Sequence, residues 1–130
     1  MTACPEPVVG SVPRDLPLVD RRLLNLGGGQ FGHKVVYQRT VARRVVVSVG
    51  DEPLDTLEDL DMNESDQVIA GRQVKVSTTH LQPGLAVVEV PASLPRDCGS
   101  LFVLTERLTP RELSDLVGSV RLVDAPAGEG

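Results

Sequence analysis

The sequence predicts an α+β fold, an antiparallel sheet that carries one capped C-terminal helix on a face. Valine and leucine dominate the apolar residues, and only three residues are aromatic (Phe31, Tyr37 and Phe102). Such a composition favours pleated sheet, on which β-branched side chains pack well. The 10 prolines and 12 glycines fall mostly between apolar runs, where turns are expected. One segment near the C-terminus combines a helix-start signal with helical spacing.

The length of 130 residues fits one domain with its own core. Residues 1–18 are rich in proline and show no periodic pattern, which predicts a tail or an extended lead-in. Residues 19–123 form the predicted domain. Residues 124–130 are expected to be a disordered C-terminal end.

Apolar runs separated by turn signals predict the strands. Val74 and Val76 alternate with polar neighbours, which is the period of a half-buried strand. Turns are expected at Thr40–Arg43, Gly71-Arg72 and Gln82–Gly84. The expected strands are, in order, Lys34–Gln38, Arg44–Val49, Val68–Ala70, Gln73–Thr79, Leu85–Val90, Ser100–Thr105 and a short edge strand, Val120–Val123.

The helix-start signal is a capping box. The Thr109 hydroxyl accepts a hydrogen bond from the Glu112 N–H, and the Glu112 carboxylate accepts one from the Thr109 N–H. Pro110 occupies the first helical position, where its missing N–H costs nothing. We expect the helix to end near Gly118 and to present one apolar stripe to the core. The stripe consists of Leu113, Leu116, Val117 and Val120.

The formal net charge of -5 argues against nucleic acid as a partner, because phosphate binding depends on lysine and arginine. No apolar run is long enough to span a membrane. The acidic charge is concentrated in Asp51–Asp66, which holds eight carboxylates and no basic group. Leu54, Leu57 and Leu60 recur every three residues there, which predicts a short amphipathic helix or a 3₁₀ turn.

We expect a small soluble, non-enzymatic module that binds a protein partner, and two charged surfaces are candidate sites. The first is an acidic docking face for a basic partner. It consists of Asp55, Glu58, Asp59 and Asp61. The second is a basic patch at the first hairpin, formed by Arg39, Arg43 and Arg44. Two other interpretations of these arginines stay open: protection of a strand edge, or neutralisation of the acidic segment within the fold.

Two motifs imitate ligand sites. Gly27–Gly32 matches G-x-G-x-x-G and resembles the glycine-rich loop of protein kinases. A strand rather than a helix follows it, however, and the strand after that, Arg44–Val49, lacks the lysine that a kinase needs. We interpret it as a glycine turn between two strands. Asp59, Asp61 and Asn63 imitate the start of an EF-hand loop, but Glu64 stands where glycine is required. We therefore expect neither a cofactor nor a metal site.

Two alternative functions remain. A small hydrolase or transferase would use His33 or His80, although acid–base chemistry needs partners within hydrogen-bond reach and no spacing supplies one. A structural or assembly component would exploit the valine-rich strands for self-association. The sequence does not fix the oligomeric state.

Cys4 and Cys98 are interpreted as two unrelated thiols, one in the tail and one in a turn. A disulfide between them would close 94 residues and would require an oxidising compartment. The N-terminus shows no basic start and no apolar signal-peptide region. We therefore expect a cytoplasmic location, or an extracytoplasmic one if the chain is an excised domain.

The order of these elements resembles a known family. Val35-Val36-Tyr37 opens a hairpin, Ala70–Arg72 turns into two long strands, and Ser100–Thr105 leads into Leu108–Leu113 and Gly118–Val120. This order is similar to the C-terminal domain of the periplasmic sigma-E regulatory proteins, which are partners of membrane anti-sigma factors, and to related small lipoprotein-like domains. The resemblance covers residues 31–123. It implies a strongly bent antiparallel sheet with a helix packed on one face, export, no catalysis, and a role in protein or lipid recognition.

The chain departs from that family in three respects. No export signal is visible, Gln38-Arg39 stands where the family has an aspartate-glycine pair, and the acidic segment 51–66 has no counterpart. The partner's identity therefore does not follow from the resemblance. We expect a regulatory or interaction module, with sigma/anti-sigma signalling as the setting that the resemblance implies.

Overall fold

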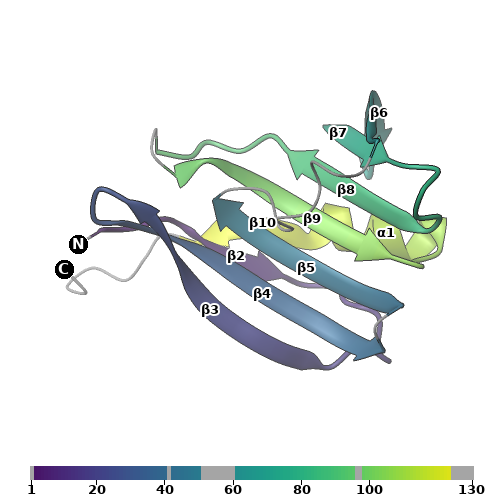
Figure 1. The fold of residues 1–130 in the computed structure, drawn as a ribbon, viewed down its shortest axis with the longest axis horizontal. Coiled ribbons are helices and arrows are strands. Elements are labelled where there is room, and N and C mark those ends of the chain that lie inside the picture. Colours follow the sequence, from purple (N-terminus) through teal and green to yellow (C-terminus); the bar gives the residue numbers. More distant parts are fainter. Residues whose placement is uncertain (1, 41, 51–60, 96–97, 124–130) are drawn as a thin grey trace.

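The computed structural model describes residues 2–40, 42–50, 61–95 and 98–123 (Figure 1). The elements are, in chain order, β1 (Thr2–Ala3), β2 (Glu6–Val9), β3 (Leu18–Gly27), β4 (Gln30–Thr40), β5 (Arg43–Gly50), β6 (Asn63–Ile69), β7 (Arg72–Thr78), β8 (Leu85–Val90), β9 (Ser100–Glu106), α1 (Pro110–Ser119) and β10 (Val120–Val123).

The strands form one large sheet and one small one. The large sheet has the order β1-β4-β5-β9-β8-β7-β6, and β3 also pairs with β4. Its neighbours are antiparallel except for the short parallel pair β1–β4. β2 and β10 form the small antiparallel sheet. The predicted antiparallel sheet with a C-terminal helix is therefore confirmed.

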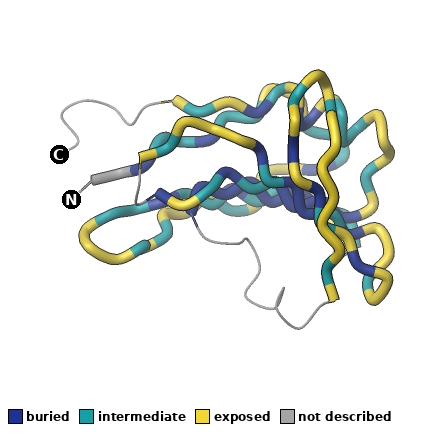
Figure 2. The backbone as a smooth tube through the Cα atoms, turned by 90° about the horizontal axis from the view of Figure 1, so that it is seen from above, coloured by how far each residue is buried: buried dark blue, intermediate teal, exposed yellow. Residues whose placement is uncertain are grey.

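Tight turns connect the long hairpins. Gly28 and Gly29 join β3 to β4 with positive φ angles of 60° and 79°, which glycine adopts without steric cost. Both are exposed at the tip of the hairpin (Figure 2), which confirms the interpretation of a glycine turn between two strands. Ala70 and Gly71 join β6 to β7 in the same left-handed region.

The main core lies between the large sheet and a second layer made of α1, β2 and β10 (Figure 1). Because side chains alternate along a strand, every second residue of β5 and β9 enters this core. The fully buried members include Val45, Val47, Val49, Val103, Leu116, Val117 and Val120. A smaller cluster on the opposite face of the sheet holds Val46, Leu85, Val87 and Leu104.

The helix follows its sequence signals. Both hydrogen bonds of the capping box are present at Thr109 and Glu112, and Pro110 is the first helical residue. The helix ends at Ser119, one residue beyond the expected Gly118, because Val120 already has extended backbone angles (φ -74°, ψ 131°). The chain passes directly into β10, the predicted short strand.

The proline-rich lead-in contains strands. β2 pairs with β10 along its whole length, so the two ends of the described chain lie side by side. Leu16 is buried in the main core. Residues 63–66 of the acidic segment belong to β6, whereas the helix or turn expected over Leu54–Leu60 lies outside the described residues. In the described part of the chain, no helix is long and apolar enough to cross a membrane.

Candidate interaction sites

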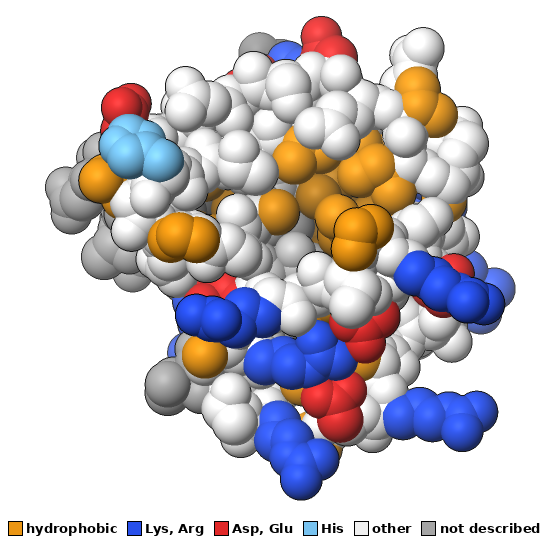
Figure 3. All heavy atoms as spheres, turned by 90° about the vertical axis from the view of Figure 1, so that its right-hand side faces the viewer, with side chains coloured by type: hydrophobic (Ala, Val, Ile, Leu, Met, Phe, Trp, Pro, Cys, Tyr) orange, Lys and Arg blue, Asp and Glu red, His pale blue; other side chains and the backbone are white. Residues whose placement is uncertain are grey.

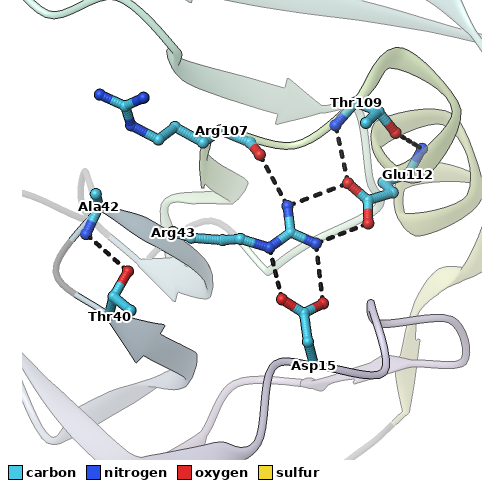
Figure 4. A network of polar contacts seen from close by, with 7 residues as sticks. All are labelled: Asp15, Thr40, Ala42, Arg43, Arg107, Thr109 and Glu112. Carbon is cyan, nitrogen blue, oxygen red and sulfur yellow. Dashed lines mark hydrogen bonds and ion pairs between the residues drawn. The ribbon is translucent and has the colours of Figure 1, made fainter.

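The most connected polar group is Arg43, at the start of β5 (Figure 4). Its guanidinium donates to both carboxylate oxygens of Asp15 (2.7 and 2.9 Å) and to both of Glu112 (3.2 and 2.7 Å). It also donates to the backbone oxygen of Arg107 (2.8 Å). These five bonds use all five N–H donors of the side chain. Arg43 therefore joins the lead-in, the sheet and the helix start, and its guanidinium is fully engaged within the chain.

These contacts shift the acidities of the network. The Arg43 guanidinium holds the pKa of the Asp15 carboxyl below its ordinary value, mainly through their hydrogen bonds. The pKa of Glu112 is also lowered, first by Arg43 and then by the Thr109 N–H. The two carboxylates in turn raise the pKa of Arg43. Each shift favours the charged form in the folded protein.

Because of these ion pairs, we expect the stability of the folded protein to depend on pH. In the unfolded chain both carboxyls have pKa values of about 4. Because the pKa values in the folded protein are lower, the contribution of the two carboxylates to the free energy of unfolding is complete above about pH 5. This contribution is lost as the pH falls below about 4. The variant Arg43→Gln should therefore have a lower melting temperature than the wild type at neutral pH, and this difference should shrink in acid. Thermal unfolding between about pH 7 and 3 measures it.

Arg39→Gln is the matched control, because Arg39 is exposed at the end of β4 and forms no ion pair with a described residue. Arg39 adds only the last of the contributions that lower the pKa of Asp15, so the melting temperature of this variant should stay close to that of the wild type at every pH. If the melting temperature of Arg43→Gln stays below that of the wild type by the same amount from neutral to acid pH, the ion pairs of Arg43 do not stabilise the fold as described.

The remaining charged candidates are distributed differently. Arg44 donates to the buried carboxylate of Glu106 (2.6 Å), which also accepts from Gln82 (3.2 Å). The groups that the sequence offered to an acidic partner, Arg43 and Arg44, thus have partners inside the chain. Asp61 is exposed just before β6. The rest of the proposed acidic face, Asp55, Glu58 and Asp59, lies outside the described residues.

Charged side chains of both signs mix at this end of the molecule. Figure 3 shows the end that carries the β4–β5 turn and the start of α1, with basic and acidic groups interspersed over the lower half and hydrophobic groups gathered above them. The intermixing agrees with the ion pairs of Arg43 and Arg44.

The two histidines are not brought together. His33 lies on β4 opposite Val49, and its Nε2 lies 2.7 Å from the Cys4 carbonyl oxygen. His80 is exposed in the turn between β7 and β8, at the other end of the sheet. The strand pairs place the start of β8, just after His80, level with Val45 of β5, whereas His33 is opposite Val49. Val45 and Val49 are four residues apart, which is roughly 13 Å along the strand. Among the described residues, no three histidine, cysteine or carboxylate groups gather as metal ligands.

Cys4 and Cys98 form a disulfide, so the interpretation of two unrelated thiols is wrong. Both residues are fully buried. The Gln30 amide donates to both sulfurs (3.2 and 3.0 Å), and the Cys4 N–H donates to the Phe31 carbonyl (2.7 Å). The bond ties the lead-in to the loop before β9. Sequence spacing did not reveal it, because the two cysteines meet only through the order of strands β1, β4, β5 and β9 in the sheet.

The sheet divides between β7 and β8. Their ladder stops at the pair Lys75–Glu89, although β7 continues back to Arg72. Two open hollows lie at this division, with volumes of about 600 and 490 Å³. Gln73 and Pro91 line both. We call the division, residues 72–74 and 90–92, the β7–β8 fork.

Arg72 and Arg121 line the larger hollow, together with buried apolar groups of β8, β9 and β10. Sequence reasoning missed both arginines. Pro91, directly after a predicted strand, was the available signal for an interrupted ladder, but no local pattern indicates that Arg72 and Arg121 line the same hollow.

Comparison with protein-family models, with curated proteins and with solved structures finds no match for this chain. The resemblance to the sigma-E regulatory domains therefore stays a prediction.

Proposed function

We propose that this protein is a non-enzymatic binding module that holds a segment of a partner protein along the free edge of β3. The observation that carries this proposal is the edge itself. β3 has ten residues and pairs, among the described strands, only with β4. It is the outermost strand on the lower side of the sheet in Figure 1. An open edge offers backbone N–H and C=O groups to an added strand.

The side chains of this edge also favour a partner. Leu18, Val19 and Leu23 are 49%, 55% and 59% exposed, which makes β3 the strand with the most exposed large apolar residues among those described. Covering them removes apolar surface from water, at about 25 cal/mol per Å². Soluble proteins usually protect long edges with charges and bulges, and β3 carries three charged residues and two register shifts. The apolar side chains that it nevertheless exposes favour an interaction site.

The charges of β3 do not repel a second strand. Arg21 pairs with Glu6 at 2.7 Å, and Arg22 pairs with Asp20. Each arginine is therefore neutralised by a neighbouring carboxylate. The main chain between the apolar positions stays available for pairing.

Leu23→Lys tests the proposal. A charge at the centre of the edge should weaken partner binding by about tenfold or more, because the ammonium would be desolvated by the added strand. The fold should keep its melting temperature, since Leu23 is largely exposed. The measurement is photo-crosslinking from position 19 in the extracytoplasmic fraction of the source cells, compared between wild type and variant.

Val68→Lys is the control, because Val68 is exposed on β6, the strand at the opposite edge of the sheet. Adducts that survive Leu23→Lys, or that Val68→Lys removes equally, would reject the β3 edge as the binding site. An adduct of the chain with itself, together with a dimer mass by light scattering, would favour the assembly alternative over a separate partner.

We also propose that the module works in an oxidising compartment. The buried Cys4–Cys98 disulfide supports this, since structural disulfides form and persist outside the reducing cytosol. It favours the extracytoplasmic location over the cytoplasmic one expected from the N-terminus.

A further inference from the structure

The β7–β8 fork has a cause in the sequence. The ladder pairs Thr78 with Ala86 and ends at Lys75 with Glu89. Continuing this register by two residues places Gln73 opposite Pro91. Proline has no N–H and cannot donate to the ladder. The two strands therefore separate at this point, while β7 stays fully paired with β6 on its other side.

The separation leaves one residue of β7 with unpaired backbone groups. Ile69 and Arg72 flank the two-residue turn and form the closing pair, so the backbone N–H and C=O of Arg72 point toward β6. Because these directions alternate along a strand, Gln73 directs its N–H and C=O away from β6, toward the fork. No described strand pairs with it on that side. The fork thus presents one donor and one acceptor spaced for an extended peptide.

The larger hollow beside Gln73 is lined by apolar residues and by two arginines. Its floor includes Val90, Leu101 and Val120, all buried in the core, and Leu122 adds a partly exposed wall. Arg72 and Arg121 also line it. Neither arginine forms an ion pair with a described residue, whereas Arg43 and Arg44 do. Arg72 belongs to the same face of β7 as the buried Val74 and Val76, and exposed Arg121 lies between Val120 and Leu122 of β10. A guanidinium complements a carboxylate that is attached to an apolar group.

We propose that the β7–β8 fork binds the C-terminal residues of an extended polypeptide, with its terminal carboxylate held by Arg72 and Arg121. The peptide backbone pairs with Gln73, and the last apolar side chain enters the hollow over Val90, Leu101 and Val120. A fatty acid would satisfy the arginines and the hollow, but it has no amide to pair with the Gln73 backbone. This inference is independent of the β3 edge, which lies on the other side of the sheet.

The test uses a fluorescein-labelled hexapeptide of alternating serine and valine that ends in valine, either as the free acid or as the C-terminal amide. By fluorescence polarisation, the wild-type protein should bind the free acid about tenfold or more tightly than the amide. The double variant Arg72→Gln/Arg121→Gln should bind both peptides equally, at the affinity of the amide. The double lysine variant should restore part of the preference.

Arg111→Gln, an exposed position on α1, is the matched control and should leave the preference unchanged. In amide NMR spectra, the peptide should shift the Gln73 N–H and slow its hydrogen exchange. Pro91→Val supplies the missing N–H, so it should extend the β7–β8 ladder and reduce binding of both peptides. Leu23→Lys should bind the hexapeptide like the wild type, which separates this site from the β3 edge.

Equal affinity for the acid and the amide in the wild type would overturn the carboxylate assignment. Decanoate that binds with the same arginine dependence, while the hexapeptide leaves the Gln73 N–H unshifted, would replace the peptide site by a site for acyl anions. Unchanged spectra of the double glutamine variant outside the fork would verify that its losses are not due to unfolding.

Discussion

Replacing both cysteines by alanine should lower the free energy of unfolding by about 4 kcal/mol. The Cys4–Cys98 bond closes a segment of 94 residues, and releasing a loop of that length gives the unfolded chain entropy worth about 4–5 kcal/mol. The melting temperature should fall by about 15 °C for a domain of this size. Alanine is the better replacement, because a serine hydroxyl would be buried at both positions.

The same loss should appear when the wild type is melted with a reductant, and reductant should not affect the double alanine variant. Hydrogen exchange in the variant should speed up first in β1, which Cys4 follows directly and which has only two residues in its ladder with β4. Two free thiols in the purified wild-type protein, with a melting temperature that reductant does not change, would contradict the disulfide.

Substituting Gly32 by alanine should cost about 3 kcal/mol, at the upper end of the usual range for overpacking. A Cβ atom at this position would clash with the Val49 carbonyl oxygen of the neighbouring strand. A backbone oxygen in the middle of a sheet cannot move aside as a flexible side chain would. The pair β4–β5 would therefore have to separate locally, next to the His33–Val49 pair.

Gly10→Ala provides the comparison, because its added Cβ would meet Ser119 at an ordinary 3.5 Å. Its unfolding free energy should stay within about 0.5 kcal/mol of the wild type. Urea unfolding of the three proteins measures both differences. A Gly32→Ala variant as stable as Gly10→Ala would show that the close approach of β4 to β5 is not as described.

Gly32 also shows how a motif can be read for the wrong chemistry. In the dinucleotide-binding G-x-G-x-x-G motif the second glycine lets the backbone approach the phosphates, and the last allows a helix to pack closely on a strand. Here Gly32 instead allows the backbone of β4 to approach β5, and only Gly28 and Gly29 form the turn. The strand after the motif, visible in the sequence, was sufficient to set the nucleotide interpretation aside.

The acidic segment and the arginines show where prediction from composition ends. Charge density indicated an acidic face, but most of its proposed residues lie outside the described part of the chain. Arg39, Arg43 and Arg44 are neighbours in sequence, yet Arg39 is exposed while the other two are held by carboxylates from distant segments. Sequence proximity could not distinguish them, because the partners of Arg43 come from the lead-in and from the helix.

The sequence by itself determined many of the local elements: the strands β4, β5, β7, β8 and β9, the glycine turn, the capped helix and the short strand after it. It did not predict the bounds of β3 or the strands of the lead-in. Each predicted element depends on backbone preferences and hydrogen bonds among residues a few positions apart, so its signal is local. Only the tertiary structure decided that Cys4 meets Cys98, that Glu112 binds Arg43 as well as its own helix start, and that Arg72 and Arg121 line the same hollow. These contacts depend on strand order and register, which bring together groups separated by tens of residues and which no pattern of neighbouring residues specifies.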